Sequence, residues 1–111
     1  MPHAELKYSA DLEIDAEAIL AEVEAVILRH DAGSGECKGR AYPAASFHHS
    51  HLILELSLLS KPHRDEAFTH ALLTDVEQAV KARIAQPCFF SLSLNYSAGY
   101  YVTNTHAVEK L

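Results

Sequence analysis

Four segments of the chain alternate between apolar and polar side chains with a period of two residues. They are His3–Tyr8, Cys37–Tyr42, His51–Leu59 and Phe90–Tyr96. The pattern is clearest in the third segment, where every second position from Leu52 to Leu58 is a leucine, and it is weaker in the second. Period two with one apolar face is typical of strands in a sheet that is covered on one side. We therefore predict four strands.

Two further segments space their apolar side chains as amphipathic helices do. In the first they are Ala16, Ile19, Leu20, Val23, Val26 and Ile27, and in the second Phe68, Leu72, Leu73, Val76, Val80 and Ile84. Asp15 directly precedes the first segment and suits an N-cap. The loop 31–35 contains two glycines and ends the first helix, whereas Pro87 follows the second segment and cannot continue a helix. The sequence thus predicts one helix in each segment.

The predicted order is β-α-β followed by a second β-α-β, and the two halves also resemble each other in sequence. Residues 18–24 (Ala-Ile-Leu-Ala-Glu-Val-Glu) align with residues 71–77 (Ala-Leu-Leu-Thr-Asp-Val-Glu) at an offset of 53. The same offset brings Cys37 to Phe90, near the starts of the two return strands. A duplicated unit predicts an α+β fold, with a four-stranded sheet and both helices on one face. We expect residues 1–111 to form a single domain.

The sheet face without helices is predicted to carry mixed side chains. These are Glu5, Lys7, Ile53, Glu55, Ser57, Ser91 and Ser93. Such a face is neither core-like nor strongly charged, which favours subunit packing, and a small sheet with two helices leaves no deep pocket of its own. We therefore expect a ring-like oligomer with its sites between subunits.

Composition and charge narrow the class of protein. About half of the residues are apolar (49%), yet no stretch approaches the roughly 20 residues that span a bilayer. The first residues lack the basic and apolar regions of a signal peptide, so we expect a cytoplasmic protein without a membrane partner. The net charge of −6 argues against a nucleic-acid partner. It does not exclude a small anionic substrate, which responds to the local field of a pocket.

Neither cysteine belongs to a metal or redox motif. Cys37 and Cys88 lie 51 positions apart, and we expect both to be reduced and structural. The chain also has eight histidines, of which His48, His49 and His51 are clustered. Two imidazoles on one face can ligate zinc or nickel, but a site needs further ligands. We expect these clustered histidines to form the polar start of a strand and not a metal site. We also expect no cofactor.

Pro2 is the residue that most specifically indicates a chemical function. Methionine before a small residue such as proline is normally removed, which would leave Pro2 with a secondary amine instead of an amide. The reference pKa of an α-amino group is about 7.7–8.0, and burial or nearby cations lower it. Here Pro2 directly opens a predicted strand. A base near neutral pH, held on a strand, suits proton transfer beside a carbonyl group.

Several motifs accompany Pro2 along the chain. They are Met1-Pro2-His3, the basic segment Lys38-Gly39-Arg40-Ala41, the leucine-rich third strand, Arg64-Asp65-Glu66, Leu92-Ser93-Leu94 and Tyr101-Val102-Thr103-Asn104. Together with the duplicated β-α-β order, they resemble the tautomerase superfamily, and within it the 5-carboxymethyl-2-hydroxymuconate isomerase family. The resemblance covers nearly the whole chain. Two features depart from the family pattern: His63 stands before Arg64 where glycine is usual, and the connection from Pro43 to Ser50 is short.

The resemblance implies a cytoplasmic homotrimer that isomerises small unsaturated 2-hydroxy or 2-keto carboxylic acids in the breakdown of aromatic compounds. Pro2 would act as the general base at a subunit boundary. Lys38, Arg40 and Arg64 would hold the substrate carboxylates and stabilise charge on the reacting oxygen. A guanidinium group binds a carboxylate through two parallel hydrogen bonds, whereas lysine contributes a compact positive charge. Lys38 and Arg40 share a face of the predicted strand, so both can serve one site.

Two alternatives remain open from the residues alone. The chain can be a non-catalytic oligomer of the same fold, in which Pro2 has no chemical role. It can also be a ferredoxin-like regulatory domain that binds metal through the cluster His48–His51. Near the end of the chain, Tyr101 and His106 are candidates to line the site of a neighbouring subunit.

Overall fold

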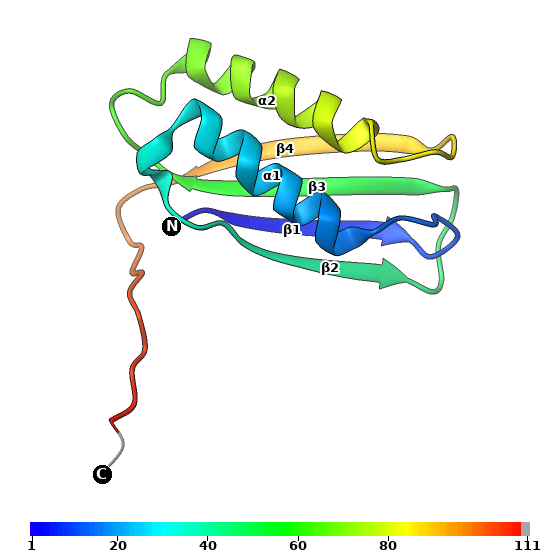
Figure 1. Ribbon diagram of the computed structural model, residues 1–111, viewed down its shortest axis with the longest axis horizontal. Coiled ribbons are helices and arrows are strands. Elements are labelled where there is room, and N and C mark those ends of the chain that lie inside the picture. The colour runs from blue at the N-terminus through cyan, green and yellow to red at the C-terminus, as the bar shows by residue number, and fades with distance from the viewer. Residues whose placement is uncertain (110–111) are drawn as a thin grey trace.

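The structure, a computed structural model, describes residues 1–109 and contains one mixed sheet with two helices on one of its faces (Figure 1). The strands are β1 (His3–Ser9), β2 (Lys38–Ala44), β3 (His51–Leu59) and β4 (Phe89–Ser97). Their order across the sheet is β2-β1-β3-β4. The predicted α+β fold is thereby confirmed.

The helices begin and end as the sequence signals predict, within a few residues. Helix α1 spans Ala16–His30, and Asp15 caps it by accepting a hydrogen bond from the Ala18 N–H at 3.1 Å. Helix α2 spans Glu66–Lys81, and Asp65 accepts from the Phe68 N–H at 2.9 Å in the same way. Side-chain caps of this kind satisfy backbone donors that have no partner within the helix.

The core lies between the helix pair and the central strands. All four even-numbered leucines of β3 are at most 1% exposed, as are Ala4 and Leu6 of β1. They pack against buried aliphatic residues of both helices, namely Ile19, Val23, Val26, Ile27, Leu72, Val76 and Val80. Gly39 of β2 lets α1 approach the sheet edge closely, because a Cβ there would lie 2.9 Å from Leu20 Cδ2. None of the helices in residues 1–109 is long and apolar enough to cross a bilayer.

The sheet consists of two parallel pairs joined through its centre. β1 is parallel to β2 and β3 is parallel to β4, whereas β1 and β3 are antiparallel. The start of β1 therefore lies beside the end of β3, with His3 opposite Ser57. The start of β2 is at this end as well, because Lys38 pairs with His3. The C-terminal segment also leaves β4 here, next to the N-terminus (Figure 1). The N-terminal end of the sheet thus gathers segments from across the chain.

Candidate active site at the N-terminal end of the sheet

Pro2 is buried at the start of β1. Its carbonyl oxygen accepts a hydrogen bond from the Lys38 N–H at 2.9 Å, which ties it to the first residue of β2. Its nitrogen forms the peptide bond with Met1, which is half-buried. Since a backbone bond to a neighbouring strand holds the proline, the position of its nitrogen is fixed by the sheet and does not depend on a flexible side chain.

Lys38 and Arg40 project from β2 onto the sheet face without helices, beside His3 and Glu5 of β1. Arg40 Nε donates to Glu5 Oε1 at 3.2 Å, and an Arg40 terminal nitrogen lies 3.3 Å from His3 Nδ1. Lys38 Nζ donates to Glu36 Oε2 at 2.7 Å. The two cations share one face, as their spacing predicts. Both are exposed, and exposed ion pairs are weak, so a carboxylate ligand can compete for these groups.

The protonation of the neighbouring groups suits an anion site. Burial, and then the positive charge of Arg40, lowers the pKa of His3 below its usual value of 6.5. A neutral His3 can accept a hydrogen bond from Arg40 through Nδ1, which orients the guanidinium group. The hydrogen bond to Glu36 raises the pKa of Lys38, which therefore keeps its charge. The strand pair β1–β2 thus presents two permanent cations at one end.

Arg64 makes hydrogen bonds within the chain that the sequence did not predict. Its side chain is only 3% exposed, and it donates through Nε and a terminal nitrogen to Asp31 Oδ2, at 3.1 and 2.9 Å. Its other terminal nitrogen donates to the Leu59 carbonyl at 2.7 Å. All three of its nitrogens are thus used within the chain. Arg64 thus fastens the β3–α2 loop to the end of α1. Its role as a carboxylate clamp stays a prediction.

Asp31 is the centre of a cluster that it forms with Arg64 and His63. Its Oδ2 also lies 2.7 Å from His63 Nε2. The hydrogen bond from His63, and then the hydrogen bonds and charge of Arg64, lower the pKa of Asp31 to about 2 against the opposing effect of burial. Asp31 is therefore ionised at any pH near neutrality. Sequence reasoning missed this pairing because the partners are 33 positions apart and no local pattern links them.

Tyr101 reaches the N-terminus of its own chain. Its hydroxyl donates to the Met1 carbonyl oxygen at 3.3 Å, and the Thr103 hydroxyl lies 3.7 Å from Met1 Sδ. The turn that directs it there contains Gly99 at φ 71°, and the Tyr101 N–H donates to the Gly99 carbonyl at 2.9 Å. Gly99 was the available sequence signal, since such a φ favours glycine. Sequence reasoning placed Tyr101 only as a candidate for a neighbouring subunit.

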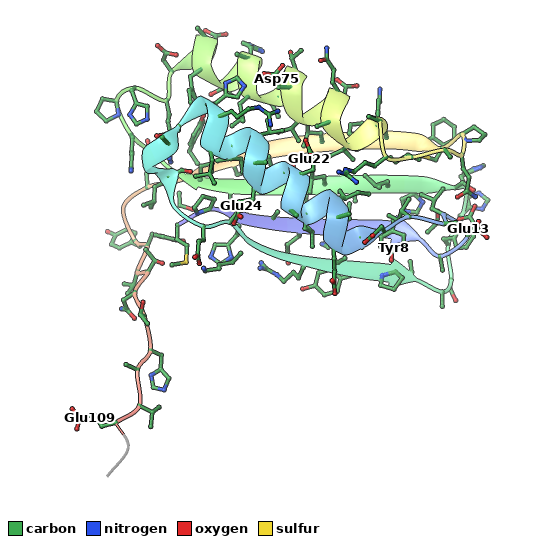
Figure 2. All side chains as sticks on the ribbon, in the orientation of Figure 1. Tyr8, Glu13, Glu22, Glu24, Asp75 and Glu109 are labelled. Atoms are coloured by element: carbon green, nitrogen blue, oxygen red, sulfur yellow. The ribbon has the colours of Figure 1, made fainter. Side chains whose placement is uncertain are left out.

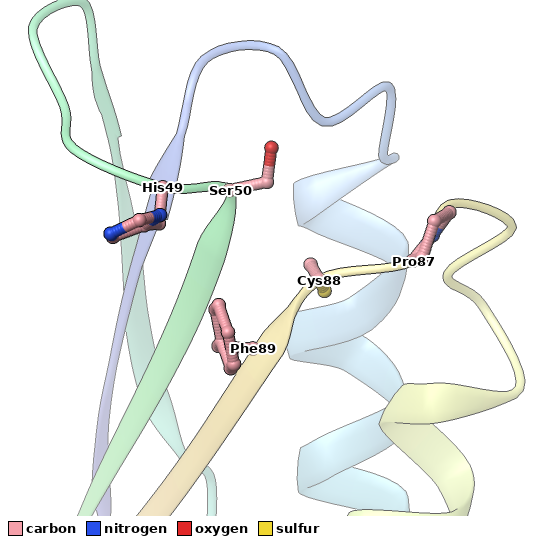
Figure 3. Close-up of a pocket in the computed structure, with 5 residues that line it drawn as sticks. All are labelled: His49, Ser50, Pro87, Cys88 and Phe89. Carbon is pink, nitrogen blue, oxygen red and sulfur yellow. The ribbon is translucent and has the colours of Figure 1, made fainter.

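The remaining candidates lie away from this end. An open pocket of about 340 Å³ at the opposite end of the sheet is lined by His49, Ser50, Pro87, Cys88 and Phe89 (Figure 3). The rings of His48 and His49 are tilted by 53° with centroids 4.0 Å apart, and His51 Nδ1 lies 2.8 Å from the His49 carbonyl oxygen. Within residues 1–109, no three His, Cys, Asp or Glu side chains converge as a metal site requires.

Both cysteines are free thiols at opposite ends of the sheet, before β2 and β4. Burial, and then the charge of Glu24, raises the pKa of Cys37 to about 11. Glu24 (labelled in Figure 2) reaches from α1 to the start of β2, where it accepts the Cys37 N–H at 2.8 Å. Cys37 is therefore protonated near neutral pH and poorly nucleophilic.

Comparison with known proteins shows which fold this is. The chain matches no protein-family model and no curated protein sequence. Among solved structures, a 5-carboxymethyl-2-hydroxymuconate delta-isomerase is 22% identical over 97% of this chain and 89% of its own, with a TM-score of 0.64. A 5-carboxymethyl-2-hydroxymuconate isomerase from Deinococcus radiodurans R1 is 19% identical over 94% and 90%, with a TM-score of 0.69. A fused 4-OT, described as a wild-type symmetric trimer, is 11% identical over 92% and 93%, with a TM-score of 0.67. The chain has the fold that these proteins share.

Proposed function

We propose that this protein is an isomerase that moves a proton within small unsaturated 2-hydroxy or 2-keto carboxylic acids, with Pro2 as its general base. The observation that carries the proposal is the placement of Pro2. It is held at the start of β1 by the Lys38 N–H, beside a strand that presents Lys38 and Arg40. The solved isomerases of the same fold support this class of reaction.

The base requires that Met1 is removed, because only then does the Pro2 nitrogen have a free lone pair. Nearby cations favour the neutral amine over the ammonium form, since they repel a third positive charge. The neutral amine takes the proton from the 2-hydroxyl of a dienol and returns a proton to a carbon of the conjugated chain. The product is an unsaturated ketone, and the base is regenerated.

Lys38 and Arg40 are proposed to hold the substrate carboxylates. Each is exposed and forms a weak surface ion pair, Lys38 with Glu36 and Arg40 with Glu5. Arg40 also contacts His3. Arg64 takes no direct part in this proposal. Its role is to keep the β3–α2 loop fixed at the same end of the sheet, through Asp31 and the Leu59 carbonyl.

We propose further that the protein forms a homotrimer with sites at subunit interfaces. The sheet face without helices is half-buried at Glu5, Ile53, Glu55 and Ser57 and carries few strongly apolar groups. Both outer strands also leave one edge unpaired, which natural sheets usually cover or protect. The fused 4-OT of the same fold is a symmetric trimer. A neighbouring subunit would enclose Pro2 and the exposed cations.

A kinetic experiment tests the catalytic proposal. Protein with Pro2 confirmed as the first residue by mass spectrometry is assayed with 2-hydroxymuconate. We expect Pro2→Ala to lower kcat/KM by at least about a hundredfold, because general-base catalysis contributes factors of that size. We expect Arg40→Ala to raise KM by about tenfold through the loss of a carboxylate contact.

Lys81→Ala is the matched control. Lys81 is also exposed and pairs with a carboxylate, Glu77 at 2.6 Å, but it lies on α2, away from the sheet face without helices. Its rate constants should equal those of the unmodified protein. If Pro2→Ala and Arg40→Ala both retain full activity, or if the Pro2-terminal protein is inactive towards dienols of this class, the proposal is wrong.

A further inference from the structure

The Tyr101 hydroxyl lies close to the Met1–Pro2 bond, which Met1 removal would break. Its hydroxyl donates to the Met1 carbonyl oxygen at 3.3 Å, in a partly buried setting. That oxygen is two covalent bonds from the Pro2 nitrogen, which places the two atoms about 2.2 Å apart by standard peptide geometry. The C-terminal segment thus brings a hydrogen-bond donor to the atom beside the proposed base.

The Met1 carbonyl oxygen marks a place that another oxygen can take. When Met1 is removed, a substrate hydroxyl that donates to the Pro2 nitrogen would sit about 2.8 Å from it, close to the position that the carbonyl oxygen leaves. The Tyr101 hydroxyl already donates to an oxygen at this position. The same donor would then meet the substrate oxygen that loses its proton.

We propose that Tyr101 is a catalytic residue that donates a hydrogen bond to the 2-oxygen of the substrate. This inference rests on the proposed function. As the Pro2 nitrogen takes the hydroxyl proton, the O–H electron pair stays on the oxygen, and a dienolate forms. The Tyr101 O–H stabilises this negative charge. The dienolate then forms a C–H bond with the proton of the Pro2 ammonium, and its oxygen becomes a carbonyl. Tyr101 keeps its own proton throughout.

The local fold explains why Tyr101 and not its neighbour takes this role. Gly99 adopts φ 71°, and the Tyr101 N–H closes the turn onto the Gly99 carbonyl. The turn leaves Tyr100 fully exposed, whereas Tyr101 is half-buried against Met1. Two adjacent tyrosines thus differ in their surroundings and not in their chemistry, which provides a matched control.

The test compares Tyr101→Phe with Tyr100→Phe in protein with a confirmed Pro2 terminus. With 2-hydroxymuconate, we expect Tyr101→Phe to lower kcat by about tenfold to a hundredfold. This is somewhat less than the roughly hundredfold to thousandfold decrease that follows the removal of an enclosed oxyanion donor. Its KM should change little, because Lys38 and Arg40 still hold the carboxylates. Tyr100→Phe should stay within about twofold of the unmodified protein.

Inhibitor binding gives a second measurement that does not depend on turnover. A 2-oxo dicarboxylate should bind the Tyr101→Phe variant about tenfold more weakly than it binds the Tyr100→Phe variant. The matching dicarboxylate without the 2-oxygen should bind the Tyr101→Phe and Tyr100→Phe variants equally. If Tyr101→Phe matches Tyr100→Phe in kcat and in both affinities while Pro2→Ala is inactive, the role of Tyr101 is refuted and the proposed function stands. If Pro2→Ala is fully active, both proposals fall together.

Discussion

Replacing Asp31 by asparagine should destabilise the protein in a pH-dependent way. Asp31 accepts hydrogen bonds from Arg64 and lies against His63, and its side chain is 12% exposed. Asparagine keeps the shape and one acceptor oxygen but loses the charge that balances Arg64. Because the Arg64 side chain is only 3% exposed, its cation would remain buried with a weaker partner. A buried charge that loses its partner strongly destabilises the folded protein.

The pKa of Asp31 sets the size of the effect. A fall from 3.8 to about 2 corresponds to roughly 2 kcal/mol of preferential binding of the ionised form. Because His63 is half-exposed, solvent screens part of its interaction with Asp31. We therefore expect the ionised Asp31 to contribute about 1–2 kcal/mol to the free energy of unfolding. Since the folded-state pKa is lowered, this stability is fully present above pH 3.8. It is lost as the pH falls through 2.

Urea denaturation at pH 6 and pH 3 measures the effect. Asp31→Asn should lower the free energy of unfolding by about 1–2 kcal/mol at pH 6 and by about half as much at pH 3. Glu77→Gln is the control, because it breaks an exposed pair with Lys81 on α2 and should cost less than about 0.5 kcal/mol. If the Asp31→Asn difference is the same at both pH values, or no larger than that of the control, the account of the Asp31–Arg64 cluster is wrong.

Two further predictions concern the core and the thiols. Leu54→Ala should lower the free energy of unfolding by about 3 kcal/mol in denaturant titrations, because Leu54 is fully buried. Ile53→Ala, on the face without helices, should chiefly weaken the proposed trimer in sedimentation experiments. A result in which Ile53→Ala destabilises the fold as much as Leu54→Ala would contradict the assignment of the two faces. At pH 8, iodoacetamide should modify Cys37 about a hundredfold more slowly than an ordinary thiol, because its pKa is about 11, and Glu24→Gln should speed the reaction. Equal rates for Cys37 in folded and urea-unfolded protein would show that the thiol is not shielded.

The periodic elements of this fold could be predicted from the sequence because they depend on neighbouring residues. The leucines of β3 fixed its bounds at His51–Leu59, as the structure has them. The other strands end one or two residues beyond the alternating segments, whereas β2 begins one residue later than predicted, at Lys38. Helix α2 ends at Lys81, before Ile84, which packs from the following turn onto the core. An apolar residue at helical spacing can therefore lie past the end of the helix.

The site was less predictable, because it depends on contacts between distant residues. Alternation correctly placed Lys38 and Arg40 on one face, since their relation is local. The engagement of Arg64 by Asp31 and the approach of Tyr101 to Met1 join residues 33 and 100 positions apart. No periodicity reports such contacts. A basic residue at a motif position looks the same in sequence whether its charge faces a ligand or is neutralised within the fold.

The antiparallel pairing of β1 and β3 gives the sheet two ends of the same kind, one for each β-α-β unit. β1 begins at the chain terminus, but β3 begins in mid-chain at His51, where Ser50 precedes it through an ordinary peptide bond. The two β-α-β units therefore share one terminal nitrogen, and a label specific for the α-amino group should saturate at one equivalent per chain, not one per unit. The opposite end of the sheet instead presents the pocket lined by His49, Cys88 and Phe89.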